Sequence, residues 1–156
     1  MKIIVKNEIA TKLLAEKIAP FLHPNLCLLL DGPLAAGKTT FTKYLLKALG
    51  VTTPVTSPTF LIMQQYTTNQ QVIINHMDCY RLLGLEQEEE WEMYFEHFSD
   101  SINIIEWPER ISNQLSSKYE VIKITIKIIN EDERIFTIKT NNKHLQSALG
   151  KRGIRC

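Results

Sequence analysis

A phosphate-binding loop constrains the fold of this chain more than any other segment. Residues 32–39 read Gly-Pro-Leu-Ala-Ala-Gly-Lys-Thr and satisfy the pattern GxxxxGK[ST]. An apolar run from Cys27 to Leu30 precedes the loop, as expected of a strand covered on both faces. A helical pattern follows from about Lys38 to Leu49. This order of strand, glycine loop and helix predicts an α/β domain of the P-loop NTPase type.

The residue types in the loop suit the phosphates of a nucleotide. Gly32 and Gly37 supply the backbone freedom that allows consecutive N–H groups to wrap phosphate oxygens. Lys38 can reach the β and γ phosphates, and the Thr39 hydroxyl can complete the coordination of Mg²⁺, which prefers oxygen ligands. The residues expected to bind the nucleotide here are Gly32, Leu34, Ala35, Ala36, Gly37, Lys38, Thr39 and Thr40.

Two carboxylates at predicted strand ends are candidates for the metal and for catalysis. Residues 102–105 form an apolar run that ends on Glu106, which we choose together with Thr39 for the magnesium. Asp78 ends the run 72–77, and it could orient the attacking water or hold a magnesium-bound water. The expected catalytic set is Glu106, Asp78 and Lys38. For an isolated acid at a strand end, a surface or capping role is the alternative, and His76, which lacks a third ligand in the sequence, is expected to pack or cap.

The remaining pattern predicts a mixed β-sheet flanked by helices in a single domain. Residues 2–5 resemble a strand, and Asn7 is a candidate N-cap for a helix with an apolar stripe at Ile9, Leu13, Leu14 and Ile18. Two hairpins are expected, 59–67 with 71–77 and 119–129 with 134–140. Further helices are expected at 86–97 and near 142–149, and Pro108 is expected in the first turn of another helix. Early alternation of strands with helices, followed by paired strands, favours a mixed sheet over a purely parallel one.

Composition sets limits on the class of protein. The 156 residues, 44% of them hydrophobic, suffice for one domain spanning 1–156, and a net charge of +1 gives no reason to expect a coat for nucleic acid or membrane. The 3 cysteines show no spacing typical of disulfides or zinc. No signal peptide or apolar run long enough to span a bilayer is visible, so we expect a cytoplasmic protein with no membrane association.

Charge is nevertheless unevenly distributed. Residues 86–100 carry seven acids and no base, whereas residues 134–155 are basic. A solvated face is favoured over a docking surface for the acidic segment. Residues 150–156 are expected to form a flexible basic tail, with contact to nucleic-acid phosphates as the alternative.

Four spaced motifs resemble one family. They are Gly32-Pro-Leu-Ala-Ala-Gly-Lys-Thr-Thr40, Thr56-Ser-Pro-Thr-Phe60, His76-Met-Asp-Cys-Tyr-Arg-Leu82 and Ile105-Glu-Trp-Pro-Glu109. In this order they resemble the bacterial tRNA threonylcarbamoyladenosine biosynthesis ATPase family, TsaE, over about residues 7–109. The resemblance implies a Mg²⁺-dependent ATPase that supports threonylcarbamoyl modification of adenosine in tRNA. It also implies two related partner proteins, TsaB- and TsaD-like, so that tRNA is engaged indirectly.

The resemblance adds roles that the residues alone do not give. It places Ser57 and Thr59 in a mobile segment like switch I, Trp107 in a second mobile segment, and Thr11 against the adenine. Thr11 and Trp107 therefore join the residues expected to bind the nucleotide. Residue type alone would place Trp107 in the core. The family usually has glycine where Ala35 stands, which makes the loop stiffer if this position needs a positive φ.

Two other functions fit a P-loop of this size. One is a small-molecule kinase, and such kinases commonly close an arginine-bearing lid over the phosphates. Here Arg81 is the only arginine between the loop and Glu106, and Arg110 lies just beyond. No insertion in the sequence resembles such a lid, which argues against this function. The other is a nucleotide-controlled binding module without hydrolysis. ATP turnover measured with and without partners discriminates among the three.

Overall fold

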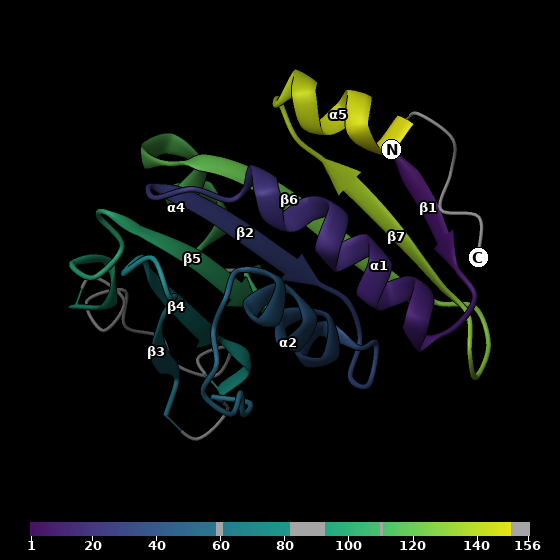
Figure 1. The fold of residues 1–156 in the computed structure, drawn as a ribbon, viewed down its shortest axis with the longest axis horizontal. Helices are drawn as coiled ribbons and strands as arrows, with labels where there is room; N and C mark the ends of the chain where they lie inside the picture. Colours follow the sequence, from purple (N-terminus) through teal and green to yellow (C-terminus); the bar gives the residue numbers. More distant parts are fainter. Residues whose placement is uncertain (59–60, 82–92, 110, 151–156) are drawn as a thin grey trace.

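A single mixed sheet organises the chain. The computed structural model describes residues 1–58, 61–81, 93–109 and 111–150, and in them 7 strands follow the order β1-β7-β6-β2-β5-β4-β3 (Figure 1). The strands are β1 (Lys2–Val5), β2 (Leu26–Asp31), β3 (Met63–Thr67), β4 (Ile73–Asp78), β5 (Ser101–Glu106), β6 (Glu120–Ile128) and β7 (Arg134–Lys139). The expected α/β fold with both hairpins is confirmed.

The pairing directions explain where the functional residues meet. Strands β6, β2, β5 and β4 are parallel neighbours, whereas β3, β7 and β1 join antiparallel at the two sides. The carboxyl ends of β2, β5 and β4 therefore lie along one edge, which is where α/β sheets form ligand sites. Asp78 is in register with Glu106 at this edge.

Helices cover the sheet on both faces. They are α1 (Glu8–Ile18), α2 (Lys38–Ala48), α4 (Ser112–Lys118) and α5 (Lys143–Gly150), with a short 3₁₀ turn η1 (Ala19–Phe21) after α1. Helices α1, α2 and α5 share the larger core with β2, β6 and β7 (Figure 1). Leu115 of α4 and Phe98 belong to a second core on the other face. No helix within the described ranges is long and apolar enough to cross a membrane.

The buried face of α1 differs from the expected stripe. The Asn7 Oδ1 atom accepts a hydrogen bond from the Ala10 N–H at 2.8 Å, which confirms the cap. Leu14 and Ile18 are buried, but Ile9 is 68% exposed and Leu13 is 38% exposed. The small residues Ala10, Thr11 and Ala15 occupy the buried face instead. Their size lets α1 pack closely on α2, and the apolar periodicity alone could not reveal this.

Other boundaries shift by a few residues. In the first hairpin, 59–60 lie outside the described residues, and β3 begins only at Met63. Of the helix expected at 86–97, residues 86–92 lie outside the described residues, 93–95 are helical and 96–97 form a turn. The Pro108 carbonyl accepts hydrogen bonds from the Ile111 and Ser112 N–H groups, so this proline stands in the turn before α4 and not in its first turn. The tail expected at 150–156 lies almost entirely outside the described residues.

The corrected face of α1 can be tested by two truncations. Leu14→Ala should lower the free energy of unfolding by about 2 to 5 kcal/mol, because it leaves a cavity in the core. Ile9→Ala should change it by less than about 0.5 kcal/mol, since that side chain is mostly in solvent. Urea denaturation of both variants measures the difference, and equal losses would contradict the observed helix orientation.

Candidate functional site

The loop between β2 and α2 has the backbone shape that its glycines predict. Gly32 has a φ of +148°, and a Cβ atom placed there would lie 2.5 Å from the backbone oxygen of Ile126. Gly37 has a φ of +100° at the N-cap of α2. Gly32 is therefore required for close approach to β6, and Gly37 for a left-handed backbone at the helix start.

Ala35 also adopts a left-handed conformation, with a φ of +61°. This position does need a positive φ, so the alanine retains the loop shape at a cost of roughly 1 to 2 kcal/mol relative to an unstrained conformation. The loop is thus formed with alanine at this position, and it stores backbone strain next to the backbone N–H groups of the loop.

Lys38 is 5% exposed and is held inside the loop. Its Nζ atom donates to the carbonyl oxygens of Gly32 at 2.6 Å and Pro33 at 2.9 Å, and it lies 3.6 Å from the centroid of the Trp107 ring. Burial lowers the pKa of Lys38, while the carboxylates of Glu106, Asp78, Glu109 and Asp31 oppose this shift. These carboxylates favour the charged ammonium that a phosphate site needs.

Glu106 is a buried carboxylate that links three elements. It is 2% exposed. Its Oε2 atom accepts from the Thr39 hydroxyl at 2.9 Å, and its Oε1 atom lies 3.4 Å from the Thr42 hydroxyl. Thr39 and Glu106, the two residues expected at the magnesium, are therefore in direct contact, and both carry oxygen atoms of the kind that Mg²⁺ prefers. Their role as metal ligands stays a prediction.

His76 is the third partner of Glu106. Its Nε2 atom lies 2.8 Å from Glu106 Oε1, and the ring is fully buried on β4. Its Nδ1 atom has no hydrogen-bond partner among the described residues, so a ring that carries a proton on Nε2 donates to the carboxylate and leaves only a lone pair unpaired. His76 therefore orients the carboxylate. The expectation that it packs or caps missed this contact, because the residues are 30 positions apart.

Asp78 and Trp107 complete this edge. Asp78 is 4% exposed, and one of its oxygens accepts from the Tyr80 N–H at 2.9 Å. Trp107 has a φ of +58°, which is rare for a bulky residue, and its ring packs on Tyr80 with centroids 4.9 Å apart. The backbone N–H group of Trp107 donates to the Leu30 carbonyl oxygen at 3.1 Å. The half-buried Trp107 side chain thus lies over the lysine, not in the core interior.

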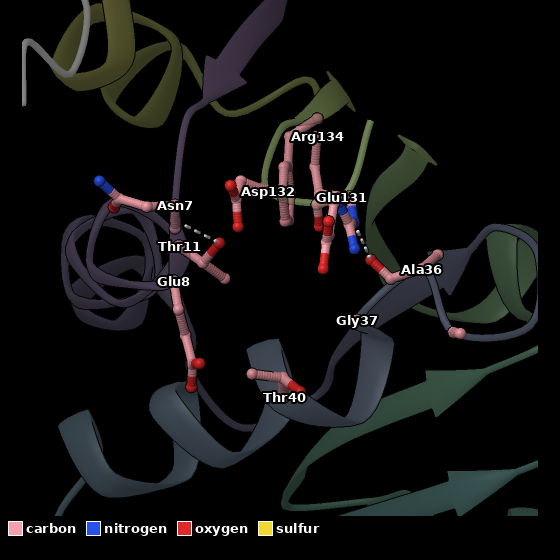
Figure 2. Close-up of a pocket in the computed structure, with 11 residues that line it drawn as sticks. Asn7, Glu8, Thr11, Ala36, Gly37, Thr40, Glu131, Asp132 and Arg134 are labelled. Atoms are coloured by element: carbon pink, nitrogen blue, oxygen red, sulfur yellow. Dashed lines mark hydrogen bonds between the residues drawn. The ribbon is translucent and has the colours of Figure 1, made fainter. Parts of the chain in front are cut away.

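Two adjoining clefts run along the loop. The first, of about 280 Å³, contains most of the expected residues, and it is lined by Leu34, Ala35, Ala36, Gly37, Lys38, Thr39, Thr40, Ser57, Asp78, Glu106 and Trp107. The second, of about 240 Å³, shares Ala35, Ala36, Gly37 and Thr40 with the first and continues to Thr11 (Figure 2). Gly32, the first residue of the loop, is buried and lines neither cleft. Thr59 falls outside the described residues, so its place in the site stays a prediction.

The second cleft contains residues that sequence reasoning did not assign to the site. Glu131, Asp132 and Arg134 from the β6–β7 hairpin face Asn7 and Glu8 at the start of α1 across the opening (Figure 2). The Arg134 Nε atom donates to the Ala36 carbonyl oxygen at 3.3 Å, which joins the hairpin to the loop. The hairpin is about 100 positions from the loop, and no local signal in the sequence indicated this approach.

Comparison with known proteins agrees with this architecture. The sequence model of the family described as "Threonylcarbamoyl adenosine biosynthesis protein TsaE" matches residues 5–136. The chain belongs to the TsaE family.

Curated relatives share this name. The "tRNA threonylcarbamoyladenosine biosynthesis protein TsaE" of Bacillus subtilis is 39% identical over 132 residues, which cover 84% of this chain and 80% of the relative. The protein of the same name from Aquifex aeolicus is 37% identical over 135 residues, covering 85% and 91%. The crystal structure of Bacillus subtilis YdiB superposes with a TM-score of 0.72 at 34% identity, covering 97% of this chain and 92% of that chain. The four motifs and the fold thus lead to the same TsaE family.

The contact between His76 and Glu106 predicts a stability effect specific to a hydrogen-bond donor. His76→Ala should lower the free energy of unfolding by about 2 to 4 kcal/mol, because the buried carboxylate loses a donor. His76→Gln can place an amide N–H near the same oxygen and should recover at least about half of this loss. Urea denaturation measures both, and equal losses would show that the histidine only fills space.

Proposed function

We propose that this chain is a nucleotide-binding component of tRNA threonylcarbamoyladenosine biosynthesis that hydrolyses ATP with Mg²⁺. Family membership supports the pathway. The observation that carries the ATPase proposal is the meeting of Lys38, Thr39, Glu106 and Asp78 in one cleft. A kinase would act on a metabolite instead, and nothing in the names of the relatives indicates this.

The two clefts divide the nucleotide between them. Backbone N–H groups of residues 34–40 and the Lys38 ammonium suit the phosphates, and the start of α2 adds a favourable field. The second cleft suits the nucleoside, with Thr11 beside the base. Carboxylates of Glu8, Glu131 and Asp132 can accept hydrogen bonds from ribose hydroxyls and an exocyclic amino group. Three carboxylates would repel phosphates, which favours this orientation of the nucleotide over the reverse.

Thr39 and Glu106 fit Mg²⁺ by their chemistry. Both present oxygen atoms, and the hydrogen bond between them places these atoms together. In the described ranges, no group of three His, Cys, Asp or Glu side chains could hold a metal alone. A Mg²⁺ ion here would take its remaining ligands from phosphates and water, as is usual, and would neutralise phosphate charge.

Hydrolysis then needs a positioned water and stabilised charge. Lys38 neutralises the phosphate oxygens, and Asp78, beside Glu106 on the next strand, is placed to orient a water toward the γ-phosphorus. The bond from the γ-phosphorus to the bridging oxygen breaks as water adds, giving ADP and inorganic phosphate. We expect this activity to depend on TsaB- and TsaD-like partners and to occur in the cytoplasm.

The proposal is tested by ATP turnover of the chain alone, with the purified partner heterodimer, and with heterodimer plus tRNA. Stimulation only with the partners supports it. High turnover on a small metabolite without partners would identify a kinase. Binding without hydrolysis in every mixture would identify a binding module.

Thr39→Ala tests the metal role of the hydroxyl. It should weaken ATP binding about 10-fold or more with Mg²⁺ present and less than about 3-fold without it, because the hydroxyl acts through the metal. Calorimetry with and without Mg²⁺ measures both. Equal losses in the two conditions would remove Thr39 from the metal site.

Glu106→Gln separates an enzyme from a binding module. It keeps the size and much of the hydrogen bonding of the side chain but removes its charge, so hydrolysis should fall at least about 10²-fold with a smaller change in ATP affinity. Asp78→Asn is the matched variant at the neighbouring strand end, and it tests the water-orienting role separately. Loss in the Asp78 variant alone would exchange the two roles, and full activity in both variants would refute catalysis by either carboxylate.

A further inference from the structure

The half of the sheet formed by β6, β7 and β1 carries a basic face on the side opposite the larger core. Alternate residues of β6, β7 and β1 pack into the larger core, and among them Ile122, Ile124, Phe136 and Ile3 are buried. The residues between them point to the opposite side and are all half-buried or exposed. They are Val121, Lys123, Thr125, Lys127, Ile135, Thr137, Lys139, Lys2 and Ile4, here called the basic sheet face.

The basic sheet face concentrates one sign of charge. It holds four lysines and no acid, although the chain as a whole is only +1. Asp31 lies at its border, where its Oδ2 atom is 3.4 Å from the Thr125 hydroxyl. Glu131 and Asp132, at the end of the same hairpin, line the nucleotide cleft instead. The four lysines of this face, with no acid among its residues, favour an anionic partner.

Two of the lysines oppose each other directly. Lys123 on β6 is in register with Lys139 on β7, and no ion pair of either lysine is present among the described residues. Like charges in directly opposed positions destabilise an antiparallel pair. A lysine opposite an acid would avoid this cost, so the like-charge pair favours a role in binding an anion.

A polar cleft continues the basic sheet face next to these lysines. It has a volume of about 280 Å³ and is lined by Lys123, Lys139, Ser112, Asn113, Ser116, Thr140, Asn141, Val121 and Leu29. Its polar lining consists of ammonium, hydroxyl and amide groups, and it contains no carboxylate. These are the side chains that contact phosphate oxygens in nucleic-acid complexes.

We propose that the basic sheet face binds the sugar–phosphate backbone of RNA, with a phosphate seated in the cleft beside Lys123 and Lys139. An acidic protein is the less fitting occupant, because lysine is depleted in protein interfaces. The basic sheet face has no aromatic residue on which bases could stack, so it suits the backbone of a folded RNA. This goes beyond the proposed function, which assigns no RNA contact to this chain.

The test uses the full-length chain and an unmodified, fluorescently labelled tRNA transcript, measured by anisotropy over a range of salt concentrations. Lys123→Gln/Lys139→Gln should reduce affinity about 10-fold or more and lower the slope of log K against log salt by roughly 1.5, since two phosphate contacts are lost. Lys43→Gln/Lys47→Gln on α2 is the control, with two exposed lysines and the same change in charge. It should reduce affinity less than about 3-fold.

The outcomes separate this proposal from the nucleotide site. ATP affinity should be unchanged in both double variants, because their lysines line neither nucleotide cleft. Urea denaturation should show the Lys123→Gln/Lys139→Gln variant to be no less stable than wild type, since a like-charge pair is removed. No RNA binding by the wild type, or equal losses in the two variants, would overturn the proposal. The proposal would also be overturned if the Lys123→Gln/Lys139→Gln variant lost binding to the partner heterodimer while its binding to RNA was unchanged.

Discussion

The buried carboxylate of Glu106 is the constraint on which the rest of the site depends. A charge that is 2% exposed is tolerated only when polar partners replace its water. Here His76 from β4 and Thr39 and Thr42 from α2 lie around it. These donors meet only if β4 and β5 keep their parallel register and α2 follows β2 at once. The sheet order and the loop geometry are therefore coupled to this single group, and the motifs spread along the sequence converge on it.

Sequence reasoning reached those parts of the fold and site that local patterns encode. The glycine loop, the apolar strands ending on Asp78 and Glu106, and both hairpins follow from spacing and residue type. The buried face of α1 did not, because Ala10, Thr11 and Ala15 bury small side chains that hydrophobicity does not mark. His76 and Arg134 were missed for another reason. Their contacts join distant strands, and no sequence period links a hairpin turn to a loop about 100 positions earlier.

Backbone strain is placed on both sides of Lys38. Ala35 and Trp107 have φ values of +61° and +58°, in a region that non-glycine residues seldom adopt. Strained conformations persist where surrounding contacts determine them. The Leu30 carbonyl oxygen accepts a hydrogen bond from the backbone N–H group of Trp107, and the Trp107 ring contacts both Tyr80 and the Lys38 ammonium. The lysine is thus held between a stiff loop and a stiff turn, which limits the rotamer freedom that it could lose when a phosphate binds.

The β6–β7 hairpin connects the two clefts along the loop with the basic sheet face. The Ile126 carbonyl closes the space above Gly32 and so requires glycine at the start of the loop. Arg134 holds the Ala36 carbonyl oxygen while it also donates to the hairpin carbonyls of Asn130 and Glu131. Lysines project from the opposite face of the same two strands. Because inward and outward side chains alternate along a strand, a one-residue shift in register would misplace both sets together. The packing that forms the P-loop is therefore also the packing that presents the lysines.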